Sequence, residues 1–166
     1  MASRKGSTLD ALVQMTQFDL VQAAADGVAV VEVDTGISTA ATFGWLIDRI
    51  EFHLADTLEG IPLATDQQIR LQLARGPSTG VFLPVSNDDM ICDFLVMLPT
   101  IAGSVGNPVL TSPLVWVPPD NYVIASPTVT ARLDTAGTGL TETYGCRIFW
   151  FPIEMSELDL LRILAQ

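Results

Sequence analysis

The sequence contains very few of the residues that most often carry out chemistry. Its 166 residues include one histidine, His53, one lysine, Lys5, and two cysteines, Cys92 and Cys146. It also has no glycine-rich loop of the kind that binds phosphate groups. These shortages argue against most catalytic and cofactor-binding classes. We therefore expect a protein that is not an enzyme and that has no catalytic, cofactor-binding or metal-binding residues.

Long hydrophobic runs are absent as well. The longest apolar runs, such as 94–98, fall far short of the roughly 20 residues that cross a membrane as a helix. The N-terminus has the charged pair Arg4-Lys5 without an apolar run behind it, so we expect no secretory signal. Cys92 and Cys146 each lie in an apolar segment, which is typical of buried thiols. A disulfide between them is possible only if their strands are neighbours.

Positive charge is scarce and scattered. The chain has 8 basic residues against 19 acidic ones, for a formal net charge of −11. Binding to nucleic-acid phosphates depends on clustered Lys and Arg, and only Arg4 and Lys5 are adjacent here. We therefore expect no direct binding to nucleic acid.

The chain is instead rich in apolar residues, with 49% hydrophobic and only 16% charged. A chain of this length forms one domain and can bury most of its apolar surface. Part of this high apolar content would suit a subunit interface, because permanent interfaces resemble a hydrophobic core cut in half. A well-packed β-domain alone would also account for it.

Alternation of apolar and polar residues predicts β-strands over most of the sequence between Phe18 and Met155. The clearest case is 67–74, where Ile69, Leu71 and Leu73 share one face. The predicted strands span 18–24, 28–35, 41–55, 67–74, 90–98, 114–117, 122–125, 128–134 and 141–153.

Local signals refine these strands. Asp26-Gly27 predicts a hairpin between the first two strands. Asp48 interrupts the apolar face of 41–55, which indicates a bulge or a strand edge there. That face is predicted to hold Leu46, Ile50, Phe52 and Leu54, with Trp45, Arg49, Glu51 and His53 on the other.

The segment 90–98 is apolar on both faces apart from Asp93, which is typical of a central strand that is covered on both sides. Segments 122–125 and 128–134 can form one strand broken at Pro127. The predicted core consists of Ile69, Leu71, Leu73, Leu95, Met97, Ile148 and Trp150.

The chain is predicted to be all-β. About eight strands with regular turn signals fit an antiparallel sandwich or barrel, and the long strands and loops favour a jelly roll. Residues 1–17 are predicted as an N-terminal arm with a short helix at 7–16, residues 18–155 as a single jelly-roll domain, and residues 156–166 as a C-terminal helix. The pairs Ser7–Asp10 and Ser156–Asp159 resemble capping boxes for these helices.

Some residues still allow a chemical interpretation. His53 has Glu51 and Asp56 nearby in the sequence, but a metal or general-base site needs further convergent ligands, and no second histidine exists. A hydrolase built on Ser86 or Ser156 would have to use the same histidine. We favour a surface or interface role for His53.

Two further groups have alternative interpretations. Asn87-Asp88-Asp89 offers three oxygen ligands for calcium, although a polar turn before 90–98 explains it more simply. Trp45, Trp116 and Trp150 could stack on sugars, but their positions in apolar strands favour the core or an interface.

Three stretches are distinctive: 147–161, 33–38 and 44–51. The first reads Arg-Ile-Phe-Trp-Phe-Pro-Ile-Glu-Met-Ser-Glu-Leu-Asp-Leu-Leu. Their arrangement over residues 18–166 resembles that of small viral capsid proteins with a single jelly roll, which tile the icosahedral shells of tailless viruses. Many such coats carry a long basic N-terminal arm that neutralises the genome, and this chain lacks one. The resemblance is therefore closer to the membrane-containing type of virus.

The resemblance implies a structural coat protein that self-assembles into an icosahedral shell in the virion, built in the host cytoplasm. Its main partners would be other copies of itself, and a second capsid or spike protein and an internal membrane are compatible with it. The alternative is a carbohydrate- or receptor-binding jelly-roll module of a spike or tail fibre. A cupin-like enzyme is a more distant third.

Overall fold

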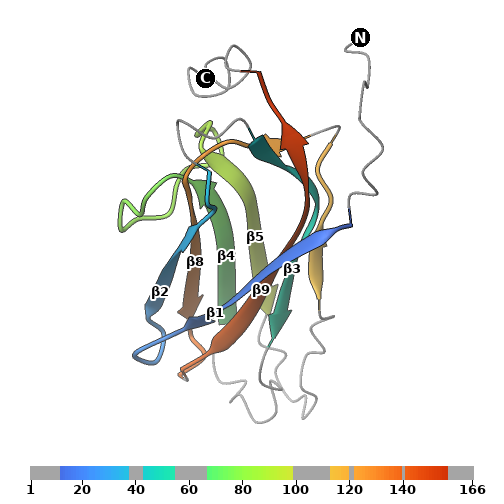
Figure 1. Ribbon diagram of the computed structural model, residues 1–166. Coiled ribbons are helices and arrows are strands. Elements are labelled where there is room, and N and C mark those ends of the chain that lie inside the picture. Colours follow the sequence, from blue (N-terminus) through green and yellow to red (C-terminus); the bar gives the residue numbers. More distant parts are fainter. Residues whose placement is uncertain are drawn as a thin grey trace.

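The computed structural model describes residues 12–37, 43–54, 67–98, 113–119, 122–139 and 141–156, and all regular structure in these ranges is β-strand (Figure 1). The strands are β1 (Gln14–Val21), β2 (Val28–Asp34), β3 (Phe43–Leu54), β4 (Gln67–Arg75), β5 (Met90–Leu98), β6 (Leu114–Trp116), β7 (Val123–Ile124), β8 (Thr128–Ala136) and β9 (Thr143–Glu154). None of the described segments forms a helix with the length and apolar character needed to cross a bilayer.

The strands form two antiparallel sheets. Sheet A has the order β1-β9-β3-β6, and β7 also pairs with β3. Sheet B has the order β2-β8-β4-β5. The two sheets pack face to face around one main hydrophobic cluster (Figure 1). The prediction of an all-β antiparallel sandwich is confirmed at this level.

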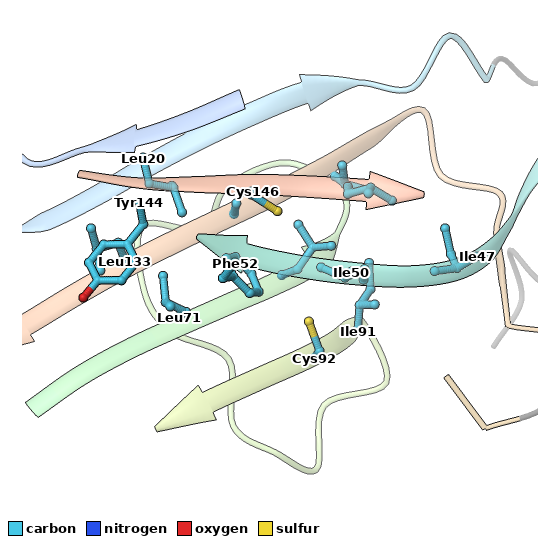
Figure 2. Packing of buried hydrophobic residues seen from close by; sticks show 14 of the residues in the cluster. Leu20, Ile47, Ile50, Phe52, Leu71, Ile91, Cys92, Leu133, Tyr144 and Cys146 are labelled. Atoms are coloured by element: carbon cyan, nitrogen blue, oxygen red, sulfur yellow. The ribbon is translucent and has the colours of Figure 1, made fainter. Parts of the chain in front are cut away.

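The core forms where the inward positions of the two sheets meet. Leu71 of β4 and Ile148 of β9 come from opposite sheets and are both fully buried. Phe52 of β3 meets Phe94 of β5 edge to face, with ring centroids 5.8 Å apart, and so joins the sheets directly. Figure 2 shows buried side chains of the two sheets facing one another, with Cys146 and Cys92 on opposite sides. The two thiols are free and their strands belong to different sheets.

A bulge in β3 decides which of its residues face the core. The register against β9 shifts between Ile47 and Arg49, which leaves Asp48 as the extra residue. Since side chains alternate along a strand, one inserted residue exchanges the two faces. Trp45 and Ile47 are therefore buried before the bulge, and Ile50 and Phe52 after it. The bulge was predicted, but the assignment of Trp45 to the outer face was wrong.

Strand β5 differs from its prediction in position and in orientation. It pairs only with β4 and so forms an edge of sheet B, not the centre. Leu95 and Met97 are 56% and 65% exposed, whereas Phe94 and Val96 pack against the core. The register explains this alternation, because Phe94 pairs with Leu71 and Val96 pairs with Ile69, and both of these partners face the core. The other predicted core residues hold their places: Ile69, Leu71, Leu73 and Ile148 are buried, and Trp150 packs against the cluster.

Two predicted strand connections also differ. Asp26 and Gly27 do lie in a turn, where Asp26 has a positive φ of 51°. However, β1 belongs to sheet A and β2 to sheet B, so this turn joins the sheets and does not close a hairpin. Likewise β7 and β8 lie in different sheets, and the chain crosses between them at Pro127. Sequence signals located these turns but not the partners of the strands beside them.

The first strand begins earlier than predicted. Residues 14–16, which were predicted to end a helix at 7–16, are part of β1 and pair with β9, as in Gln14↔Trp150. The Trp150 indole also donates to the Thr16 hydroxyl at 3.0 Å. These long-range contacts override a short helical pattern, which is marginal by itself in water. Residues 1–11 and 157–166, and with them the rest of both predicted helices, lie outside the described residues.

Candidate functional surfaces

The outer face of sheet A carries a cluster of charged side chains, which we call the ionic cluster: Asp48, Arg49, Glu51, His53 and Arg147. After the bulge at Asp48, the odd-numbered residues of β3 face outward. Glu51 lies opposite Arg147 of β9 in the register, and His53 lies opposite Gly145. The bulge therefore places these residues side by side on one surface.

Arg49 and Glu51 form the centre of this cluster. Arg49 Nε donates to Glu51 Oε1 at 2.7 Å, and its Nη1 donates to Asp48 Oδ2 at 2.8 Å. The Arg49 guanidinium also lies over the Phe149 ring, 3.8 Å from its centroid. The hydrogen bond from Arg49 lowers the pKa of Glu51, with a smaller contribution in the same direction from His53. Glu51 is thereby held in its ionised form.

His53 lies between groups of opposite charge. Its Nε2 atom is 2.9 Å from Glu51 Oε2 and 3.5 Å from Arg147 Nη1. Arg147 also donates through Nε to the side chain of Gln17 on β1, at 3.2 Å. Gly145 separates His53 from Asp19: a Cβ atom placed on this glycine would lie 3.4 Å from Asp19 Oδ1 and 3.8 Å from His53 Cβ. His53 therefore has Gly145, which has no side chain, on one side. On the other side Glu51 and Arg147 compete for its Nε2 atom.

The loop 76–89, which joins β4 to β5 and is drawn in green in Figure 1, covers the part of the outer face of sheet B around Gln72. The Gln72 side chain holds this loop through Leu83: Nε2 donates to the Leu83 carbonyl and Oε1 accepts from its amide, both at 2.8 Å. The Ser78 amide donates to Glu32 Oε1 of β2 at 2.6 Å. The loop thus spans the sheet from β4 to its β2 edge.

The ends of the loop are fixed by polar contacts. Arg75 donates to the main-chain oxygen of Asp88, and its guanidinium lies 3.8 Å from an Asp89 carboxylate oxygen. The Asn87 side chain accepts from the Asp89 amide at 2.8 Å, and the Asn87 carbonyl accepts from Met90 at 3.1 Å. Asn87-Asp88-Asp89 therefore forms a turn that leads into β5, as the simpler interpretation predicted. Within the described ranges, no three His, Cys, Asp or Glu side chains converge as metal ligands would.

Two arginines under this loop have very different surroundings. Arg70 donates to Asp93 from Nε and Nη2, with the shortest contact at 2.5 Å, and its guanidinium lies over the Phe82 ring. Arg132 of β8 is 1% exposed, yet its Nε and Nη1 atoms have no hydrogen-bond partner. Burial lowers the pKa of Arg132, and the carboxylate of Glu32 opposes that shift. Arg132 is thus a buried cation held without a direct partner at these two atoms.

The serine sites weighed in the sequence do not converge with the histidine. Ser86 is exposed in the loop over sheet B, whereas His53 is on the outer face of sheet A, so the sandwich separates them. Ser156 follows the end of β9, while His53 pairs near the start of that strand, at Gly145. Neither serine is positioned to use His53 as a base.

The tryptophans pack within the sandwich. Trp45 is buried and stacks on Trp150 with ring centroids 4.4 Å apart and planes 9° from parallel. Trp116 is half-buried and meets Tyr122 edge to face at 5.6 Å. These contacts agree with the core interpretation and not with a row of exposed rings for sugars.

Burial also governs the two thiols. It raises the pKa of Cys92 to about 12 and raises that of Cys146 well above its ordinary value. Since the thiolate is the reactive form of cysteine, these groups are poorly suited to nucleophilic chemistry. The prediction of buried thiols is confirmed.

The sequence did not reveal the contacts under the loop. Gln72 alternates with the core residues Leu71 and Leu73, but its burial depends on a loop more than ten residues away in the sequence. The sequence did not indicate that Arg132 is buried, because its position in the alternating pattern of β8 is one that a solvent-facing arginine would also occupy. The length of the loop was the only available hint, since loops of this length often have a specific role.

Searches against protein-family models and against curated proteins found no match to this chain.

Proposed function

We propose that the sandwich is a jelly roll and that the protein is a structural capsid protein, which self-assembles with other copies into an icosahedral shell. The order of strand pairing supports the jelly roll. β1 pairs with β9, β2 with β8, β3 with β6 and β7, and β4 with β5. When β6 and β7 are taken as one interrupted strand, this is the pairing of a long hairpin rolled into two sheets.

The treatment of β6 and β7 as one strand rests on their register. Trp116 of β6 pairs with Ile50 of β3, and Ile124 of β7 pairs with Trp45, nearer the start of β3. Both segments therefore run antiparallel to the same neighbouring strand, one after the other. Pro118-Pro119 lies between them, and proline cannot donate to a sheet. An edge strand interrupted by prolines gives two short segments in place of one long one.

Exposed apolar side chains support contacts between copies. The most exposed large apolar residues of the described chain include Leu12 at 76%, Val85 at 74%, Val117 at 67% and Met97 at 65%. They lie on both sheets and are not confined to one end. A shell subunit must contact several neighbours at once, and exposed apolar residues distributed in this way suit that geometry better than a single binding cleft.

The proposal places the protein in a virion, with other copies as its main partners and a second capsid or spike protein as a further one. Its charge of −11 favours the membrane-containing type of virus, in which the coat does not neutralise the genome. No catalytic step or cofactor belongs to this function.

The decisive experiment is the size and shape of the purified protein. Sedimentation velocity and negative-stain electron microscopy should reveal pentamers, hexamers or closed shells when concentration and salt are varied. A stable trimer would instead favour the carbohydrate- or receptor-binding module of a spike or fibre. A protein that stays monomeric or dimeric under all conditions would contradict the capsid proposal.

A further inference from the structure

We propose that His53 is a pH-dependent switch on the outer face of sheet A, which binds Glu51 when protonated and Arg147 when neutral. The inference rests on the ionic cluster alone and does not depend on the proposed function. It starts from one atom, Nε2 of His53, which lies within reach of both partners, at 2.9 Å and 3.5 Å.

The two contacts require opposite states of this atom. An ionised carboxylate only accepts hydrogen bonds, and a guanidinium only donates them. Glu51 Oε2 therefore needs a proton on His53 Nε2, whereas Arg147 Nη1 needs a lone pair there. Since a ring nitrogen carries one or the other, His53 can satisfy only one partner at a time.

In the protonated state both ring nitrogens donate, so the bond to Glu51 forms and strengthens because both groups are charged. Arg147 then faces a second cation at close range, which is unfavourable. The guanidinium keeps Gln17 as an acceptor and turns away from the ring. The described residues provide no carboxylate within ion-pair distance of Arg147 to replace this contact.

In the neutral state either ring nitrogen can keep the proton, and the surroundings decide which. Glu51 does not need the histidine, since Arg49 donates to its other oxygen at 2.7 Å. Among the described residues, Arg147 has one other acceptor, the side-chain oxygen of Gln17. Placing the proton on Nδ1 gives Arg147 a second acceptor and leaves Glu51 paired with Arg49. The neutral ring should therefore be the Nδ1–H form.

The remaining charged groups around the ring are consistent with this assignment. Asp19 of β1 lies beyond Gly145, and Asp48 is joined to the cluster through Arg49. Neither is hydrogen-bonded to Nε2, whose contacts among the described residues are with Glu51 and Arg147, so neither decides which partner that atom takes. Val115 of β6, opposite Glu51 in the register, carries no charge. The outer face of sheet A thus presents different charges to a neighbouring molecule when His53 is protonated and when it is neutral.

The chain has a single histidine, so the test is free of overlap. Protein labelled with ¹⁵N at histidine and arginine would be followed by ¹H–¹⁵N correlation spectra, long-range ones for the imidazole ring, from about pH 5 to 8. We expect the neutral ring of the unmodified protein to carry its proton on Nδ1, and the Arg147 side-chain Nε–H signal to move with the same midpoint. A neutral ring protonated on Nε2 would overturn the proposal.

Two variants test the cause. In Arg147→Met the neutral ring should change to the Nε2–H form, because Glu51 becomes the only competing partner. In Glu51→Gln it should remain Nδ1–H. Glu154→Gln, an exposed change at the far end of β9, is the matched control and should alter neither spectrum. An Arg147→Met spectrum identical to that of the unmodified protein would refute the role of Arg147. The measurement on the unmodified protein decides the main question even if a variant fails to fold.

Discussion

The side-chain amide of Gln72 pairs with the main chain of Leu83 in both directions, much as a neighbouring strand would. Its oxygen accepts from the Leu83 amide and its nitrogen donates to the Leu83 carbonyl, each at 2.8 Å. Gln72 is fully buried as a result. One side chain therefore holds the middle of the loop 76–89 against sheet B.

Gln72→Glu should release this loop. The new carboxylate cannot donate to the Leu83 carbonyl, which would keep only the longer contact from Arg70 Nη2 at 3.4 Å, and we expect a cost of about 1–3 kcal/mol. Hydrogen exchange should show faster exchange of the Leu83 amide, and limited proteolysis should cut within 76–89. Gln68→Glu on the same strand is the control, since no hydrogen bond joins Gln68 to the loop within the described residues. Equal protection of Leu83 in both variants would contradict the role of Gln72.

Leu71→Ala should lower the free energy of unfolding by about 2–5 kcal/mol, because Leu71 is 0% exposed and its removal leaves a cavity. Leu95→Ala is the matched control on the neighbouring strand. With 56% exposure it should cost within about 0.5 kcal/mol. Chemical denaturation measures both values. Similar losses in the two variants would show that the faces of β5 are assigned incorrectly.

Arg132→Met should stabilise the protein. The guanidinium is buried with two unpartnered nitrogens, and methionine has a similar length without the cost of burying a charge. We expect a gain of about 1–3 kcal/mol in the free energy of unfolding. Arg70→Met provides the contrast: it would leave Asp93 without its ion-pair partner and should destabilise by a similar amount. A lower melting temperature for Arg132→Met would mean that this arginine has a partner in solution.

Glu51 should contribute to the pH dependence of stability. Its pKa in the folded protein is lowered from 4.5, mainly by the hydrogen bond from Arg49, so the folded state favours the carboxylate. This contribution is therefore present above about pH 4.5, the unfolded value, and is lost as the pH falls through the lower folded value. Thermal melts from about pH 2 to 7 should show a difference between the unmodified protein and Glu51→Gln near neutral pH that shrinks in acid. Glu154→Gln should show no such difference. A constant gap at all pH values would contradict this origin.

The two thiols give a direct check of the core. Because burial raises the pKa of Cys92 to about 12 and also raises that of Cys146 well above its ordinary value, neither should react with a thiol reagent at pH 8 while the protein is folded. Both should react promptly after unfolding in denaturant. Rapid modification of one thiol in the folded protein would show that the sandwich opens on that side.

The sequence predicted what depends on neighbouring residues and failed where distant contacts decide. Alternation placed Ile69, Leu71 and Leu73 in the core, and Asp48 marked the bulge in β3. The alternation of residues could not show that Trp45 faces inward, because one inserted residue exchanges the two faces of the strand without changing its composition. Leu95 and Met97 were placed in the core because apolar residues occupied both faces of β5, and only the sheet order shows that this strand is an edge.

The candidate surfaces follow the same rule. Arg49, Glu51 and His53 were correctly grouped on one face of a strand, since their spacing along β3 is local. Arg147 joins them from a strand nearly a hundred residues later, and no local pattern predicts that partnership. The competition for His53 therefore becomes visible only once the sheet is assembled.

The central position of β9 in sheet A has a consequence for how the chain is made. β9 lies between β1 and β3 and pairs with both, as in Leu20↔Tyr144 and Ile50↔Ile148, yet it follows every other described strand in the sequence. During synthesis, β1 and β3 therefore leave the ribosome long before the strand that fills the space between them. Their facing N–H and C=O groups stay open to other chains during that interval. Sheet A can close only after β9 has been synthesised, and the wide sequence separation of its partners makes that closure slow.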